Sequence, residues 1–168
     1  MIDVSMLNTM QVTDQRLQKE ECGLDEKELL RQLQADGVVS AVVSNKPDYA
    51  VKTLSAQYFP GLLAASAGAK DGVRKKPCPD AVFEVVRQLG AEALRAVYIG
   101  DSEVDVATAR NAGMPCISVS WGFRDRDVLV NAGAETYHAE ALPADGLPLR
   151  RTAIVTVCCC TMMRWMLN

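Results

Sequence analysis

Apolar residues in the middle of the chain recur in two spacings, one typical of amphipathic helices and one typical of buried strands. After Pro79 they recur at i, i+3, i+4 and i+7, and Gly90 supplies a stop signal for the predicted helix. An earlier set of leucines on one helical face stops near Gly37. The apolar positions of the two predicted helices are Leu29, Leu30 and Leu33 in the first, and Val82, Val85, Val86 and Leu89 in the second.

Short apolar runs alternate with these helices and predict buried strands. The expected strands are Val38–Val43, Leu62–Ser66, Ala96–Ile99 and Cys116–Ser120, with a last edge strand at Thr136–His138. Further helices are expected from Pro47 towards Gln57, from Glu103 to Ala112, and over Asp125–Asn131 before Gly133. Such alternation indicates βαβ units, and therefore an α/β fold with a three-layer, Rossmann-like parallel sheet that binds ligands beyond the carboxyl ends of its strands.

The two ends of the chain lack this alternation, which suggests three parts: an irregular segment 1–28, a core domain 29–146 and an atypical tail 147–168. The tail joins a β-branched run to three consecutive cysteines and several methionines. One interpretation is an extra β-like segment packed on the core, and another is an altered end produced by a frameshift or alternative splicing. A membrane anchor is disfavoured because the run is short and contains Arg164.

Composition narrows the classes of function. The 168 residues carry a formal net charge of −3, which argues against nucleic acid as the main partner. No signal peptide or membrane-spanning run is recognised, and the cysteines lack metal-ligand spacing, so we expect a cytoplasmic protein with free thiols. The cysteines are Cys22, Cys78, Cys116, Cys158, Cys159 and Cys160.

Three polar clusters follow predicted strands or turns, and each has a functional and a structural interpretation. Asp101 and Asp105, in Gly100–Asp105, are suited to hold Mg²⁺, although Asp101 or Ser102 could instead cap a helix. Lys76, in Arg74–Pro77, could neutralise a phosphate or belong to a solvated basic turn. Ser44 and Asn45 could bind phosphate oxygens or form an ordinary N-cap.

Together the clusters are more specific, because Ser44 precedes Lys76 by 32 residues and Lys76 precedes Asp101 by 25. The order resembles motifs II, III and IV of the haloacid dehalogenase superfamily. Three further stretches look like its phosphoglycolate phosphatase branch: Tyr58–Gly61, Ala109–Pro115 and Val119–Phe123. The resemblance runs from about Leu29 to about His138.

The resemblance implies Mg²⁺-dependent hydrolysis of a small phosphorylated metabolite through an aspartyl-phosphate. Ser44 and Asn45 would bind phosphate, Lys76 would neutralise charge as a catalytic residue, and Asp101 and Asp105 would hold Mg²⁺. Neither a membrane nor a nucleic acid is expected as partner, and the oligomeric state stays open.

One part of the family pattern is missing. No Asp-x-Asp follows a suitable strand, and only 43 residues precede Ser44, so the first central strand and most of the cap are lacking, with 1–28 as a residual cap. We expect the chain alone to be inactive, or nearly so. The alternatives are a non-catalytic phosphate- or Mg²⁺-binding regulatory relative and a non-functional gene fragment. We further hypothesise that Thr152–Cys158 or Ile2–Met6 fills the vacant central position, because unpaired central backbone groups are costly.

Overall fold

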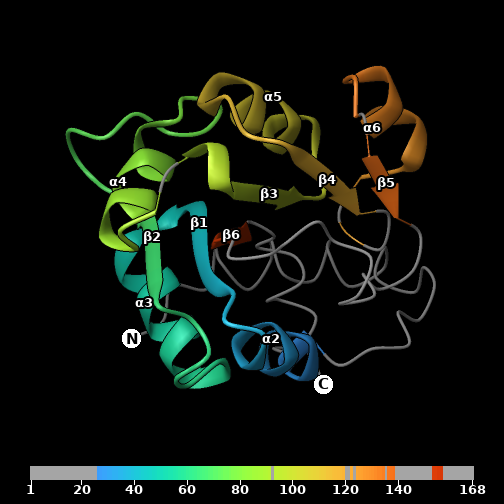
Figure 1. Ribbon diagram of the computed structural model, residues 1–168. Helices are drawn as coiled ribbons and strands as arrows, with labels where there is room; N and C mark the ends of the chain where they lie inside the picture. Colours follow the sequence, from blue (N-terminus) through green and yellow to red (C-terminus); the bar gives the residue numbers. More distant parts are fainter. Residues whose placement is uncertain are drawn as a thin grey trace, which may run out of the picture.

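The computed structural model describes residues 26–91, 93–119, 122, 124–134, 136–138 and 153–156. Within them a parallel sheet has the strand order β2-β1-β6-β3-β4-β5 (Figure 1). The strands are β1 (Val39–Pro47), β2 (Ala65–Ala69), β3 (Ala96–Gly100), β4 (Cys116–Val119), β5 (Thr136–His138) and β6 (Ala153–Thr156). The helices are α2 (Glu26–Ala35), α3 (Asp48–Tyr58), α4 (Asp80–Gln88), the short 3-10 turn η1 (Ala93–Arg95), α5 (Glu103–Ala112) and α6 (Arg126–Asn131).

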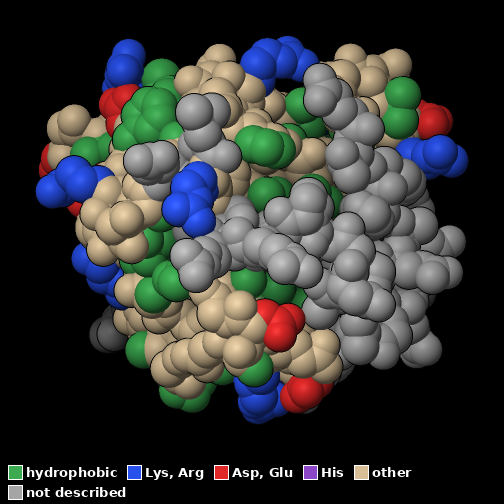
Figure 2. Space-filling model, in the orientation of Figure 1, with side chains coloured by type: hydrophobic (Ala, Val, Ile, Leu, Met, Phe, Trp, Pro, Cys, Tyr) green, Lys and Arg blue, Asp and Glu red, His purple; other side chains and the backbone are tan. Residues whose placement is uncertain are grey.

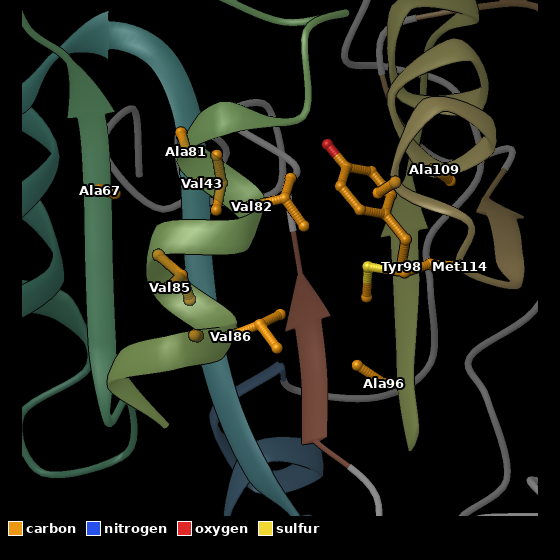
Figure 3. Close-up of a cluster of buried hydrophobic side chains, with 12 residues drawn as sticks. Val43, Ala67, Ala81, Val82, Val85, Val86, Ala96, Tyr98, Ala109 and Met114 are labelled. Carbon is orange, nitrogen blue, oxygen red and sulfur yellow. The ribbon is translucent and has the colours of Figure 1, made fainter. Parts of the chain in front are cut away.

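Helices cover both faces of this sheet, which confirms the predicted three-layer, Rossmann-like α/β arrangement. In Figure 1, α4 and α5 lie on one side of the strands, and α2 and α3 lie on the other. The strands alternate accordingly, since successive side chains point to opposite faces. In β1, Val43 packs with the residues of α4 and α5, whereas Val42 packs with those of α2 and α3. The first of these clusters is drawn in Figure 3, where Val82, Val85 and Val86 of α4 face the strands.

The second strand starts later than the sequence predicts. Its expected range was Leu62–Ser66, whereas β2 spans Ala65–Ala69. Leu62 and Leu63 instead pack against the cluster that contains Val51 and Phe59, so their apolar side chains serve the α3 side of the core. Small residues form the strand because α3 starts close beside it: a Cβ on Gly68 would lie 2.5 Å from the Asp48 Cα.

The vacant central position of the sheet is filled from the end of the chain. Strand β6 pairs in parallel with β1 on one side, where Ala41 matches Val155, and with β3 on the other, where Tyr98 matches Val155. The hypothesis that Thr152–Cys158 fills the gap is therefore confirmed for Ala153–Thr156, and the alternative segment Ile2–Met6 lies outside the described residues. The division into 1–28, 29–146 and 147–168 stays a prediction, although the last part contributes a strand to the core sheet.

The surface, the helices and the cysteines of the described region add three observations. On the face drawn in Figure 2, the Lys and Arg side chains of the described residues stand apart and do not gather into one basic patch. None of the helices placed in the structure has the length and apolar character required to cross a bilayer. In the same part of the chain, neither Cys78 nor Cys116 forms a disulfide.

Candidate active site

Two of the predicted clusters meet at one edge of the sheet because the strands that carry them are parallel. In the sheet, Val42 of β1 and Ile99 of β3 both match Thr156 of β6. Ser44 and Asp101 each lie two residues beyond these matched positions. The carboxyl ends of β1 and β3 therefore bring Ser44 and Asp101 to the same edge, on either side of β6, where the fold class places ligands.

Lys76 reaches this edge from the loop between β2 and α4. Its Nζ donates to Oδ1 of Asp105 at 2.7 Å, and the two side chains are only 10% and 2% exposed. Its neighbours behave differently: Arg74 pairs with Asp80 at 2.9 Å on the surface, and Lys75 is exposed. The basic-turn interpretation thus holds for Arg74 and Lys75, while Lys76 turns inward as the predicted charged group of the site.

Asp105 accepts hydrogen bonds on both of its carboxylate oxygens. Besides Lys76, the hydroxyl of Tyr98 donates to Oδ1 at 3.1 Å. Oδ2 accepts from the Ser102 hydroxyl at 2.6 Å and from the backbone N–H of Asp101 at 3.3 Å. Gly100 makes room for this carboxylate, because a Cβ there would lie 2.2 Å from the Asp105 Cβ. Asp105 is therefore held firmly as the counter-charge of Lys76.

Tyr98 supports this arrangement from the hydrophobic core. Its side chain is fully buried, and Figure 3 shows its hydroxyl oxygen directed out of the cluster, towards the end of the sheet at which the β6 arrow points. Burial, followed by the nearby Asp105 carboxylate, raises the pKa of Tyr98 well above its ordinary value. The phenol therefore stays protonated and remains a hydrogen-bond donor to Asp105.

The side chain of Asn45 is bonded to the backbone of Lys76. Its Oδ1 accepts from the Lys76 N–H at 2.8 Å, and its Nδ2 donates to the Lys76 carbonyl at 3.1 Å. One residue further on, Asn111 Nδ2 of α5 donates to the Pro77 carbonyl at 2.9 Å. Two asparagines thus tie the lysine loop to the end of β1 and to α5.

Ser44 is 5% exposed, and its hydroxyl accepts from the backbone N–H of Lys46 at 3.2 Å. The N-cap interpretation of Ser44 is wrong, because Pro47 occupies the N-cap of α3 and β1 continues through to that residue. For α5, by contrast, the capping alternative is confirmed: the Ser102 side chain accepts from the Asp105 N–H at the helix start.

Asp101 is enclosed by the loop after β4. It is 4% exposed, and a Cβ on Gly122 would lie 2.1 Å from the Asp101 Cβ and 2.3 Å from its Oδ2. The same loop is fixed by Arg124, whose guanidinium forms two hydrogen bonds with Glu103 at 2.7 and 2.8 Å. Arg124 holds the pKa of Glu103 below its usual value, so Glu103 stays the charged partner of this clamp.

The carboxylates differ in how well they fit a Mg²⁺ ion. Among the described residues, no group of three or more His, Cys, Asp or Glu side chains is placed to hold a metal. Magnesium in proteins often takes only one or two carboxylates and keeps several waters, which Asp101 at the sheet edge would suit. Asp105 fits a direct ligand less well because donors from the protein already engage both of its oxygens. Both ligand assignments stay predictions.

Several residues of this site were not found by sequence reasoning. Tyr98, Asn111, Gly122 and Arg124 act through contacts with residues elsewhere in the chain, which are Asp105, Pro77, Asp101 and Glu103, respectively. A signal existed for Asn111 and Gly122, which lie in the stretches Ala109–Pro115 and Val119–Phe123 that resemble the family. The others depend on how the loops pass one another, which apolar periodicity does not encode.

Comparisons with known proteins agree with the architecture and with the family that the motifs resemble. The sequence profile of the haloacid dehalogenase-like hydrolase family matches residues 6–119, and so begins before Leu29, where the resemblance was first placed. The phosphoglycolate phosphatase of Yersinia pseudotuberculosis is 32% identical over 130 residues, which cover 73% of this chain and 54% of the relative. That of Xanthomonas campestris is 30% identical over 125 residues, covering 68% and 57%.

Solved structures show the same relationship. A phosphoglycolate phosphatase homologue from Lactobacillus delbrueckii subsp. bulgaricus is 44% identical with a TM-score of 0.66, and the match covers 68% of this chain and 48% of that one. CbbY from Rhodobacter sphaeroides, solved with xylulose-1,5-bisphosphate, is 26% identical with a TM-score of 0.58, covering 67% and 51%. The chain spans about half the length of the curated relatives it matches. The profile match over more than half of the sequence shows that this chain belongs to the haloacid dehalogenase-like hydrolase family.

Proposed function

We propose that this chain carries the phosphate- and Mg²⁺-binding half of a phosphatase of the phosphoglycolate phosphatase type, acting on a small phosphorylated metabolite. The observation that carries the proposal is the ion pair between Lys76 and Asp105, 2.7 Å apart, at the edge of the sheet where Ser44 and Asp101 also lie. A buried, fixed ammonium at a sheet edge that also carries a serine hydroxyl suits the binding of a phosphate dianion.

Each residue has a distinct task in this proposal. The Ser44 hydroxyl donates to a phosphate oxygen, and the Lys76 ammonium, oriented by Asp105, neutralises a second oxygen. Asp101 would hold Mg²⁺, which when bound supplies positive charge to the transferring phosphoryl group. Asp105 orients the lysine through their ion pair. The phosphatase names and the sugar bisphosphate of similar proteins support a small phosphate ester as substrate.

The central strand is not followed by a carboxylate of the kind that attacks phosphorus in the family mechanism. The central position of the sheet is taken by β6, and the sequence from Arg151 to Asn168 contains no Asp or Glu. We therefore propose that this chain binds phosphate and Mg²⁺ but turns over substrate very slowly, if at all. The same observation supports a second candidate function, a non-catalytic relative that binds the ligands in a regulatory role.

Hydrolysis of an aryl phosphate, with and without Mg²⁺, tests the proposal when combined with calorimetric titration of inorganic phosphate. We expect phosphate binding that is strongly weakened but still measurable in Lys76→Met, and no turnover above background. Mg²⁺-dependent turnover that disappears in Asp101→Ala would overturn the inactive assignment. Absence of any phosphate binding would overturn the proposed site and favour a fragment without function of its own.

A further inference from the structure

We infer that Asn45 is a positioning residue that fixes Lys76 for phosphate, and that it is not itself a phosphate ligand. The inference rests on the proposed function for the identity of the ligand, but its geometry stands independently. It revises the role expected for Asn45 from its place next to Ser44.

The contacts of Asn45 form a reciprocal pair. One side-chain amide accepts from the N–H of Lys76 and donates to the carbonyl of the same residue, at 2.8 and 3.1 Å. Two bonds to both polar groups of a single residue resemble one rung of a β-ladder, and they define the position and the orientation of that peptide. A lone hydrogen bond would leave the loop free to rotate about it.

The lysine is consequently held at both of its ends. Asn45 fixes its backbone to the last part of β1, and Asp105 fixes its ammonium at the start of α5. Asn111 adds a third anchor at the Pro77 carbonyl, 34 residues away in sequence. The distance between the Ser44 hydroxyl and the Lys76 ammonium is therefore set jointly by Asn45 and Asp105, because Asn45 follows Ser44 in β1 and fixes the Lys76 backbone, while Asp105 fixes the ammonium.

This distance matters because charge stabilisation depends on donors that are already in place. A group that is misplaced by about an ångström loses much of its effect on a reacting or bound ligand. The Asn45 amide nitrogen has a second hydrogen that could reach a phosphate directly. A test must therefore distinguish an effect through Lys76 from a direct contact.

The first arm of the test reads the position of Lys76 without any ligand. The purified chain and Asn45→Ala are acetylated with limiting acetic anhydride, and each lysine is quantified by mass spectrometry. We expect labelling of Lys76 to rise about fivefold in the variant, as the loss of two modest hydrogen bonds implies. Lys70 and Lys75 serve as internal references, and Asn131→Ala, exposed at the end of α6, serves as the matched control. Unchanged labelling of Lys76 would overturn the inference.

The second arm uses a double-mutant cycle on the affinity for inorganic phosphate, with Asn45→Ala, Lys76→Met and both changes together. If Asn45 acts through Lys76, Asn45→Ala weakens affinity about fivefold alone and has no further effect once Lys76 is replaced. An equal loss in both backgrounds would indicate direct contact with phosphate and overturn the inference. If the unaltered chain binds no phosphate, the proposed function fails, whereas the labelling arm still decides the role of Asn45.

Discussion

Replacing Gly100 with alanine should disrupt the charged centre of the site from within the sheet. Gly100 ends β3, and an added Cβ would lie 2.2 Å from the Asp105 Cβ and 2.7 Å from its Cγ. Carbon atoms in contact require about 3.5 Å, so Asp105 and the strand must separate by about 1.3 Å. A shift of this size would break the 2.6 Å bond from Ser102 and stretch the 2.7 Å ion pair with Lys76.

The expected cost has two parts. Overpacking a buried site destabilises by about 1–3 kcal/mol. Weakened hydrogen bonds to a buried carboxylate add roughly 1.5–3 kcal/mol. We therefore expect Gly100→Ala to lower the free energy of unfolding by about 3–5 kcal/mol, a large share of the roughly 5–15 kcal/mol typical of a domain.

Equilibrium urea unfolding, followed by circular dichroism and tryptophan fluorescence, measures this loss. Gly72→Ala is the matched control because an added Cβ there has no neighbour within 4 Å, while its φ of +78° imposes backbone strain. The control should lose only about 1 kcal/mol. If Gly100→Ala loses no more than Gly72→Ala, the steric argument for Gly100 is refuted.

Three further changes test other parts of the structure. Tyr98→Phe should lower the free energy of unfolding by about 1–2 kcal/mol, because it removes the 3.1 Å hydrogen bond to Asp105 and leaves the ring in place. In ultraviolet titration of the unaltered chain, a Tyr98 phenolate that forms near pH 10 would contradict the raised pKa. The Gly68 N–H and Lys52 lower the pKa of Asp48 below 3.8. The contribution of the Asp48 carboxylate to the free energy of unfolding is therefore present above that pH, and it is lost as the pH falls through the pKa of Asp48 in the folded protein. Asp48→Asn should therefore reduce the loss of the free energy of unfolding at acidic pH. An unchanged dependence on pH would contradict this role of Asp48. Val155→Pro in β6 should cost about 3 kcal/mol or more and raise amide exchange in β1 and β3, because proline cannot donate to a central ladder.

Much of the fold could be predicted because its element boundaries are marked by residues with strong local preferences. Gly113, for example, has a φ of +67° at the end of α5, where the sequence analysis ends that helix. The misplaced strand shows the limit of this reasoning. Leu62 and Leu63 have the more strand-like side chains, but the close approach of α3 favours the small residues of Ala65–Ala69, and that approach is a tertiary constraint.

The sequence indicates which residues the candidate site contains more readily than it indicates what each of them contacts. Ser44, Lys76 and Asp101 could be recognised because each occupies a fixed place in a spaced motif. The partners of Asp105 and Asn45 could not be recognised in this way. Both residues contact Lys76, which lies 29 residues from Asp105 and 31 residues from Asn45 in the sequence. Residue type and spacing place the side chains of the candidate site at the sheet edge. The hydrogen bonds between them then determine which carboxylate pairs with Lys76.

The position of β6 links the architecture to the proposal that this chain binds phosphate without turning it over. A central strand must pair on both sides, so any segment that occupies this place needs a backbone able to form two parallel ladders, and β6 supplies one. Backbone pairing is independent of side-chain chemistry, which means that a strand can complete the sheet without supplying a carboxylate at its end. The sheet edge around Ser44, Lys76 and Asp101 can thus be assembled although no Asp or Glu follows β6. Completion of the fold does not require completion of the catalytic site, and for that reason binding and turnover have to be measured separately.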